Sequence, residues 1–465
     1  MRVRKLLVLL LGLVLLLAAC SGGSGNPSSG TQETVESETN SGTENETSKE
    51  PGETENSGGE EEEVYRTPDM DFDLGGKTIK VVSWWDMTNQ ERNPDEIAKK
   101  KNLDALMEKH NFKIEYIAID FGEYQEKVTA SLLAGEPIGD IVRLGKNYTI
   151  PALVKQDLLW PIDEYTKNVR AFDQLASNQI FTYEGRGYGF SETRGNTVQG
   201  IFYNRTLMNQ LGLKPLQDYV NEDQWNWDTF IQVAKDSNKD TNNDGKLDTW
   251  GLANSSLIEH ALYSNNTGLT KENKQTLEDP ATLEALNFVS RLATEKIARP
   301  TEGGDWREPS QFFRQGNTLM YAGALYELGG IKTDMPDFDI GFVPFPKGPN
   351  ATTYHTLEGA YQALAIPKSV ENPEQLLYIW EKINDIDSIY EYPDQADYET
   401  VFSTEDDLNN ARLAAPNLIV LEHGSFPKLP YWEFVGELNE GISVSTVVEK
   451  YKSTFQAAID EVYGK

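Results

Sequence analysis

The stretch FKIEYIAIDFGEYQEKVTASLLAGEPIGDIVRL, residues 112–144, decides the fold class that the sequence predicts. Residues 112–119 are rich in β-branched and aromatic side chains and predict a strand. The next run, 123–136, has apolar side chains at four-residue spacing and predicts a helix that closes at Gly135. A second strand follows over 140–144. This strand–helix–strand order predicts a parallel sheet with right-handed crossovers.

The residues before this stretch extend the same pattern. Residues 78–83 predict a first strand, and the apolar spacing around 95–110 predicts a helix. The chain is therefore expected to begin its folded part as an α/β domain. Ligands of such sheets bind beyond the carboxyl ends of the strands, so the residues that follow Ser83 and Arg143 are the places to expect a site.

Later helices are predicted from their apolar stripes. They begin at Trp227, with Asn226 as a cap, and at Asp279-Pro280, and they cover residues 373–383 and the C-terminus. Trp227 and Trp380 lie on these stripes. We therefore expect both rings to pack in the core.

The N-terminus carries the pattern of a secretion signal. Basic residues precede an apolar run at 6–17, which is followed by small residues and by Cys20, the one cysteine of the chain. This predicts a signal peptide over 1–19 and, because Leu-Ala-Ala-Cys resembles a lipobox, acylation of Cys20 with diacylglycerol and palmitate. A structural cysteine or a transmembrane anchor is the alternative. A single acyl chain would hold only weakly.

Residues 20–64 after the lipobox predict a disordered acidic tether. They are dominated by Ser, Thr, Gly, Asn and Glu and have too few apolar side chains to form a core. The net charge of the whole chain is −32, which argues against partners that offer a phosphate surface, such as nucleic acid. Residues 65–465 exceed the size at which one core keeps growing, so two lobes are expected.

Several motifs, in this order and at this spacing, match one family. They are LLAACSGGSG, TASLLAGEPIGDIVRL, GIFYNRTLMNQLGL, WNWDTFIQVAK, NTLMYAGALYEL, FDIGFVPFPKGP and ALAIPKSVENPEQLLYIWEKI. The chain resembles the bacterial extracellular solute-binding proteins of family 1, the maltose-binding-protein-like lipoprotein receptors of carbohydrate ABC importers. The resemblance covers residues 75–465.

The resemblance implies an α/β, two-lobed periplasmic-binding-protein fold of type II, with hinge-linked lobes and a central ligand cleft. Lobe 1 is expected over about 70–200 plus 358–390, and lobe 2 over about 205–357 plus 391–465. The chain is expected to cross between lobes near 202–205, near 358–361 and beyond Ile383.

The function implied by the resemblance is capture and delivery. A lipid-anchored monomer on the outer face of the cell membrane would bind a mono- or oligosaccharide, close its lobes, and present the ligand to ABC permease subunits. A receptor for a non-sugar solute and a secreted glycoside hydrolase are the alternatives. No enzyme is expected, since the four histidines are scattered and neither HExxH, GxSxG nor a phosphate-binding loop is present.

Candidate ligand contacts begin with Trp84, Trp85 and Asp86, directly after the first predicted strand. Sugars need aromatic rings for their apolar faces and carboxylates for their hydroxyls. We therefore expect at least one of these tryptophans to stack on ligand and Asp86 to accept hydrogen bonds from it. Since neighbouring strand residues face opposite ways, one ring is expected in the core. A tryptophan pair packed against the first lobe is the alternative.

Further contacts are implied by residue-level matches to the family. Tyr326 and Trp432 stand where sugar-stacking tryptophans occur, and Glu192 matches a carboxylate that holds sugar hydroxyls. The remaining members of the expected set are Arg143, Trp306, Glu327, Glu358 and Tyr361. Structural roles remain the alternative for each. Arginines such as Arg194 and Arg307 would suit acidic sugars, or they are solvated surface residues.

The segment DTNNDGKLDTWG, from Asp240, has the spacing of a calcium loop. The expected oxygen ligands are Asp240, Asn242, Asp244, the Lys246 carbonyl and Asp248. Gly251 stands where such loops carry a bidentate glutamate. The sequence thus predicts a weak structural calcium site and no required cofactor, with a metal-free turn as the alternative.

Overall fold

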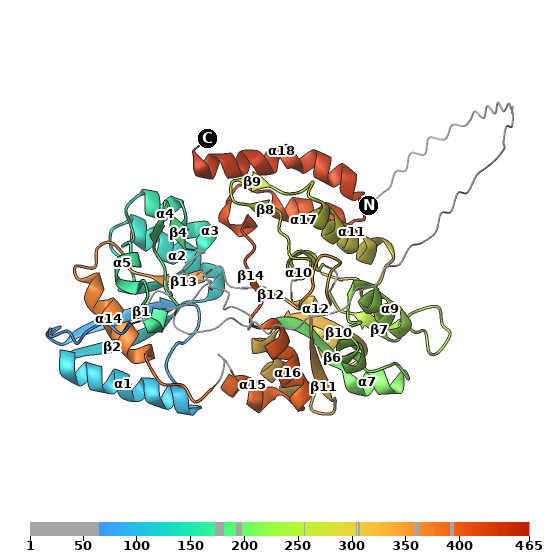
Figure 1. Cartoon of the computed structure of the whole chain (residues 1–465), viewed down its shortest axis with the longest axis horizontal. Coiled ribbons are helices and arrows are strands. Elements are labelled where there is room, and N and C mark those ends of the chain that lie inside the picture. The colour runs from blue at the N-terminus through green and yellow to red at the C-terminus, as the bar shows by residue number, and fades with distance from the viewer. Residues whose placement is uncertain are drawn as a thin grey trace, which may run out of the picture. The chain divides into compact units, whose positions relative to one another are not determined.

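The computed structural model describes residues 65–172, 181–191, 198–254, 256–303, 305, 307–357, 362–390 and 395–464. The predicted signal peptide, Cys20 and the tether lie outside these residues. The described part contains two four-stranded sheets and three two-stranded sheets (Figure 1). Its strands are β1 Lys77–Ser83, β2 Phe112–Ala118, β3 Ile141–Gly145, β4 Thr182–Tyr183, β5 Arg186–Gly187, β6 Gln199–Asn204, β7 Trp250–Leu252, β8 Thr270–Lys271, β9 Lys274–Gln275, β10 Thr318–Ala324, β11 Ile340–Pro344, β12 Thr356–Leu357, β13 Gln362–Ala365 and β14 Leu418–Ile419.

Helices account for most of the remaining described chain. They are α1 Pro94–His110, α2 Phe121–Leu133, α3 Lys146–Thr149, α4 Ala152–Lys155, α5 Asp163–Thr166, α7 Arg205–Gln210, α8 Leu216–Asn221, α9 Trp227–Ser237, α10 Ile258–Ser264, α11 Pro280–Thr294, α12 Glu308–Arg314, α13 Leu328–Asp334, α14 Pro373–Asn384, α15 Gln395–Val401, α16 Glu405–Ala414, α17 Tyr431–Asn439 and α18 Val444–Tyr463, with the 3-10 turns η1 Arg170–Phe172, η2 Leu325–Glu327 and η3 His423–Ser425. In the described chain, no helix has the length and the apolar character needed to cross a membrane.

The first four-stranded sheet has the order β13-β3-β1-β2. Strand β1 pairs in parallel with both β2 and β3, which confirms the predicted parallel sheet. Strand β13 adds to β3 in the antiparallel direction, with Ala363 opposite Leu144. We call this sheet, together with α1, α2 and α14, the first region.

Helices cover both faces of the first sheet. On one face, Ile79 and Val81 of β1 pack with residues of α1 and α14, which lie side by side in Figure 1. On the other face, Val82 packs with Tyr124 and Val128 of α2. This alternation follows from the two-residue period of a strand.

The second four-stranded sheet has the order β11-β6-β10-β7. Strand β6 pairs antiparallel with both β10 and β11, and β7 joins β10 in parallel. Because β6 lies inside this sheet, residues 202–205 are not a crossing. The chain leaves the first region earlier, between Phe190, which bridges to Leu364, and the start of β6.

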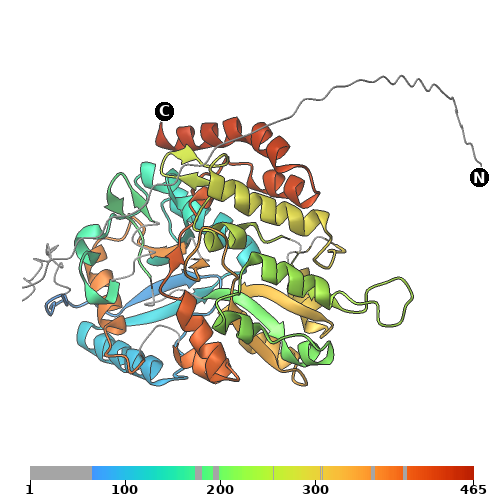
Figure 2. The ribbon, with the colours of Figure 1, turned by 45° about the vertical axis from the view of Figure 1, so that its right-hand side comes forward.

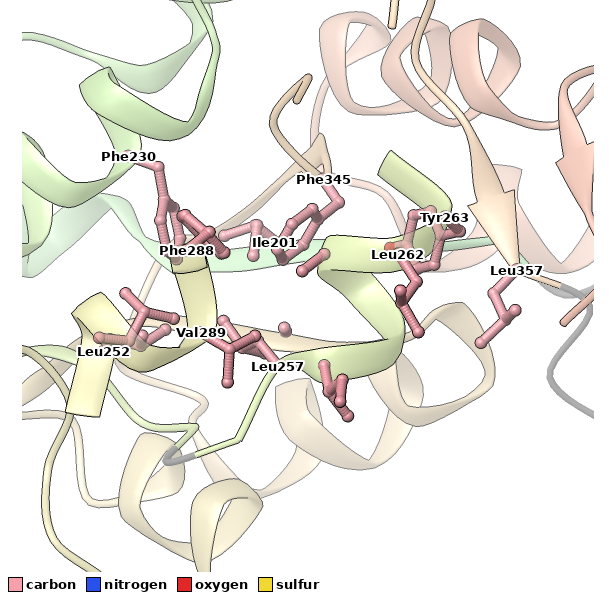
Figure 3. Packing of buried hydrophobic residues seen from close by; sticks show 14 of the residues in the cluster. Ile201, Phe230, Leu252, Leu257, Leu262, Tyr263, Phe288, Val289, Phe345 and Leu357 are labelled. Carbon is pink, nitrogen blue, oxygen red and sulfur yellow. The ribbon is translucent and has the colours of Figure 1, made fainter. Parts of the chain in front are cut away.

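A large apolar cluster surrounds the second sheet, and we call this sheet with its cluster the second region. Figure 3 shows Phe230, Phe288 and Phe345 in that cluster, with Phe230 placed 6.2 Å from Phe288 and 5.8 Å from Phe345 between ring centroids. Trp227 is buried here, and Trp380 is buried in the first region. The prediction that both tryptophans pack in the core is therefore confirmed.

The C-terminal helix α18 belongs to the second region and packs with α11 and α17 (Figure 2). Ser443 caps it by accepting a hydrogen bond from the Thr446 amide at 3.3 Å. Val448, Tyr451 and Phe455 face the cluster, as their spacing predicted.

The start of the described chain is fastened to the first region. Tyr65 forms a β-bridge with Val169, and the Arg66 guanidinium contacts the Asp385 carboxylate at 2.5 Å, just after α14. The Thr67 amide donates to the Glu381 carboxylate at 2.8 Å. These three contacts hold the entry of the chain against α14 and its neighbours.

Candidate functional site

Trp84 and Trp85 follow β1 at the carboxyl end of the first sheet, and they differ in burial. Trp84 packs against the cluster under α2, with its ring centroid 5.3 Å from that of Tyr124. Trp85 keeps 41% of its surface exposed. The two rings meet edge to face at 5.0 Å. One ring is thus largely structural and the other is available for contact.

Arg143 of β3 lies beneath these rings. Its guanidinium carbon is 4.2 Å from the Trp85 ring centroid and 5.5 Å from that of Trp84, and Nε donates to Ser83 Oγ at 3.2 Å. Only 4% of Arg143 is exposed. A buried cation over an aromatic face is attractive, so Arg143 supports the Trp85 ring from within. Direct contact of Arg143 with ligand stays a prediction.

Asp86 and the residues after it line a cavity of about 460 Å³ that also includes Trp85 and Tyr116. The Asp86 carboxylate accepts hydrogen bonds from the Thr88 hydroxyl at 2.6 Å and from the Thr88 amide at 2.9 Å. These bonds lower the pKa of Asp86. Asp86 is therefore an ionised acceptor, held in place by its own loop.

Tyr326 and Glu327 follow β10 of the second sheet. The Tyr326 side chain is 77% exposed, whereas Glu327 accepts hydrogen bonds from the Tyr321 hydroxyl at 2.8 Å and the Ala324 amide at 3.1 Å. Burial, and then the Glu327 charge, raise the pKa of Tyr321, which keeps its hydroxyl a donor. Glu327 thus fixes the turn that presents the exposed tyrosine.

Trp432 lies in the first turn of α17 and is 78% exposed. Its ring centroid is 5.0 Å from that of Tyr431, which stacks on His423 at 4.5 Å. Glu259 of α10 binds both supporting residues, with contacts of 3.2 Å to His423 Nε2 and 3.3 Å to the Tyr431 hydroxyl. Burial raises the pKa of Glu259, but interactions with His423, His260 and Tyr431, of which the His423 hydrogen bond is the largest, outweigh it and hold the pKa below its usual value.

Four predicted contacts cannot be placed in this way. Glu192, Trp306, Glu358 and Tyr361 lie outside the described residues, as does Arg194. Arg307 is described, and its guanidinium pairs with Asp305 at 2.9 Å, which accounts for its charge.

Sequence reasoning missed the support of Trp432 and a second pair of charged groups. Burial lowers the pKa of Lys146, directly after β3, and the charge of Glu422 opposes this effect. Burial likewise raises the pKa of Glu422, opposed by Lys146. These residues are more than 250 positions apart, so no spacing rule links them.

In the predicted calcium loop, the aspartate carboxylates accept hydrogen bonds from amides and a hydroxyl of the same loop. Asp248 accepts from the Thr241 hydroxyl at 2.6 Å and the Thr241 amide at 2.7 Å, and these bonds lower its pKa. Asp240 accepts from the Gly245 amide at 2.8 Å, and Asp244 from the Lys246 amide at 2.9 Å. Across the described residues, no group of three or more His, Cys, Asp or Glu side chains could hold a metal ion. Calcium binding here stays a prediction.

Comparison with known proteins adds a family and a fold. The family model for bacterial extracellular solute-binding protein matches residues 89–383, more than half of the chain. An arabinooligosaccharide-binding protein of Bacillus subtilis (strain 168) is 23% identical over 244 residues, which cover 50% of this chain and 53% of the relative. The chain thus spans about half the length of this curated relative.

Solved structures match over more of the chain. The GacH receptor of Streptomyces glaucescens GLA.O, determined unliganded and with acarbose, has a TM-score of 0.59 at 16% identity, covering 83% of this chain and 98% of that one. UgpB of Mycobacterium tuberculosis, in complex with glycerophosphocholine, has a TM-score of 0.58 at 18% identity, with coverage of 83% and 99%. Likeness at these identities shows the fold, and it confirms the predicted two-lobed α/β class.

Proposed function

Because this chain belongs to the bacterial extracellular solute-binding proteins, we propose that it is a carbohydrate receptor that delivers a mono- or oligosaccharide to an ABC importer. Members of the family bind solutes; they are not enzymes and need no cofactor. The saccharide ligands in the names of the B. subtilis and S. glaucescens relatives support a sugar as the solute.

One observation carries the proposal. Three predicted sugar-stacking rings, those of Trp85, Tyr326 and Trp432, are exposed, although large aromatic side chains are usually at least partly buried. Trp225, Trp227 and Trp380 are buried in the same chain. An exposed ring at the carboxyl end of a strand is suited to the apolar face of a sugar.

The proposed mechanism uses both regions. A saccharide stacks on Trp85, with Asp86 accepting from its hydroxyls, while Tyr326 and Trp432 contact it from the second region. A ligand can favour a closed state only through contacts that the open state lacks. Ligand contact with both regions therefore provides the free energy for closure, and the closed form is what the permease recognises.

The remaining ligand set is proposed with it. In the sequence, Glu192 lies between β5 and β6, Glu358 and Tyr361 lie between β12 and β13, and Trp306 lies between α11 and α12. The match of Glu192 to a family carboxylate, the place of Glu358 and Tyr361 at the predicted second crossing, and the place of Trp306 beside Arg307 support this proposal. We propose lobe 1 and lobe 2 with the limits given above, except that lobe 2 begins with β6.

The proposed setting is the outer face of a bacterial membrane. Residues 1–19 direct export, acylated Cys20 anchors a monomer, and residues 20–64 tether it to the permease subunits. The lipobox pattern and the composition of the tether support this setting.

Thermal shift and calorimetric titration of the purified protein test the proposal. The panel contains arabinose, mannose and glucose oligosaccharides. After incubation, each ligand is recovered and its mass is determined by mass spectrometry. We expect one series to bind and to be recovered intact. Ligand at about 100 times its Kd stabilises the fold by about 2.7 kcal/mol. Recovery of a cleaved sugar would contradict the proposal.

Glycerophosphocholine is added to this panel to test the alternative of a receptor for a non-sugar solute. The neighbour UgpB was solved with it and resembles this chain as closely as the acarbose receptor does, by TM-scores of 0.58 and 0.59. Aromatic and acidic groups also suit its cationic head. Binding of glycerophosphocholine without binding of any saccharide would establish the non-sugar receptor instead.

A further inference from the structure

Phe121 is an exposed aromatic ring that the predicted ligand set did not include. It is the first residue of α2, three positions after the end of β2 at Ala118, and 65% of it is exposed. Asp120 caps the helix by accepting from the Gly122 amide at 2.9 Å. The cap fixes the backbone at Phe121, so the exposure of the ring follows from the way in which β2 turns into α2.

The Phe121 ring adjoins the tryptophan pair. Its centroid lies 5.7 Å from that of Trp84 at an interplanar angle of 76°, and Trp84 meets Trp85 at 5.0 Å and 74°. Trp84 thus contacts two exposed rings, those of Phe121 and Trp85. The three residues follow the carboxyl ends of β1 and β2, which are adjacent in the sheet.

The support beneath these rings is buried. Trp84 packs on Tyr124, whose hydroxyl donates to the Val82 carbonyl at 2.7 Å and accepts from the Arg143 amide at 3.0 Å. Arg143 in turn lies under Trp85. The two exposed rings therefore stand on one rigid base, which keeps the entropy cost of binding low.

We infer that Trp85 and Phe121 hold two successive sugar rings of one ligand, so that the receptor selects an oligosaccharide and Phe121 sets the preference for chain length. The inference rests on the proposed function and deepens it. A monosaccharide covers one of these rings and leaves the other in water. An oligosaccharide covers both and gains the second contact.

The test measures affinity against ligand length. Wild-type protein and Phe121→Ala are titrated calorimetrically with arabinose, arabinobiose and arabinotriose, and with the corresponding mannose and maltose series. We expect Phe121→Ala to weaken binding of the trisaccharide about threefold to tenfold, the range of one aromatic contact. Monosaccharide binding should stay weak and unchanged.

Matched variants separate the ring from the helix. Phe121→Tyr keeps the ring and should keep trisaccharide affinity, whereas Phe121→Leu should lose most of it. Leu133→Ala removes another exposed apolar side chain, 54% exposed at the opposite end of α2, and should bind as the wild type does. Each variant alters an exposed side chain, so the melting temperature serves as the folding control.

The outcomes distinguish this inference from the proposed function. A saccharide that binds with the same affinity at every length, or a Phe121→Ala variant equal to the wild type, overturns the role of Phe121 and leaves the receptor intact. Equal weakening at all lengths also overturns it. If no saccharide binds at all, the proposed function fails and the inference falls with it.

Discussion

The two regions present their exposed rings in different ways. In the first region, Trp85 rests on the buried guanidinium of Arg143, at the end of a sheet that helices cover on both faces. In the second region, Tyr326 and Trp432 are almost twice as exposed, and hydrogen bonds to Glu327 and Glu259 hold residues near them, Tyr321 and Tyr431 among these. The comparison indicates a ring seated on a buried cation in the first region and rings that project further into solvent in the second.

The largest expected effect is a loss of stability of the second region at low pH. Burial lowers the pKa of His260, in α10 of the second region, from 6.5 to about 4, although Glu259 opposes it. The unfolded chain therefore takes up a proton below pH 6.5 that the folded chain refuses until about pH 4. Stability present above pH 6.5 is lost as pH falls through this window, by roughly 3 kcal/mol at most.

Urea denaturation between pH 7 and pH 4 measures this loss. His260→Phe should retain the packing against Phe345, 5.0 Å away between centroids, and should flatten the pH dependence. His355→Phe should also reduce the pH dependence, because burial lowers that pKa as well. An unchanged pH profile in His260→Phe would show that this histidine does not set the acid sensitivity of the second region.

Removal of the buried cation tests the platform. Arg143→Ala deletes the support of Trp85 and the hydrogen bond to Ser83, so the free energy of unfolding should fall by about 2 kcal/mol. Saccharide affinity should fall about tenfold. Denaturation and titration together check both effects. Arg299→Ala serves as the control, because it removes a cation that lies 4.0 Å from the centroid of the Phe312 ring. Equal losses of saccharide affinity in the two variants would show that Arg143 has no special role in supporting the binding ring.

Removal of an exposed ring should affect binding alone. Trp432→Ala should weaken saccharide binding about tenfold, near 1.4 kcal/mol, and should change the free energy of unfolding by less than about 0.5 kcal/mol. Calorimetry and urea denaturation measure the two quantities. Tyr463→Ala removes another exposed ring of the second region and should bind normally. A large loss of stability in Trp432→Ala would mean that its ring is structural.

The loop at 240–251 is expected to give the smallest effect. Calcium at about 1 mM should stabilise the wild type by about 1 kcal/mol or less, as a weak extracellular site does. Asp248→Asn should abolish this gain and should weaken the bonds to Thr241. Differential scanning calorimetry measures the melting temperature with and without calcium. Identical melting curves would establish that the loop is a metal-free turn.

Local periodicity was enough to predict much of the fold. The order β1, α1, β2, α2, β3 and the buried faces of α9, α14 and α18 follow from spacing within a dozen residues. Each of these features depends on neighbours in the sequence.

Features that depend on distant partners escaped prediction. Strand β13 pairs with β3 although more than 200 residues separate them, and the Glu259 group joins three elements. The burial of Arg143 depends on Ser83 of β1 and on the two tryptophans that follow this strand. Phe121 was missed because an aromatic residue at the start of a helix resembles a core residue until its neighbours are known.

The fastening of Tyr65, Arg66 and Thr67 has a mechanical consequence. Tension on the chain upstream of Tyr65 is borne by the Val169 bridge, the Asp385 ion pair and the Glu381 hydrogen bond, and all three partners belong to the first region or its immediate neighbours. The second sheet lies outside this load path. A pull transmitted through Tyr65 thus acts first on the first region.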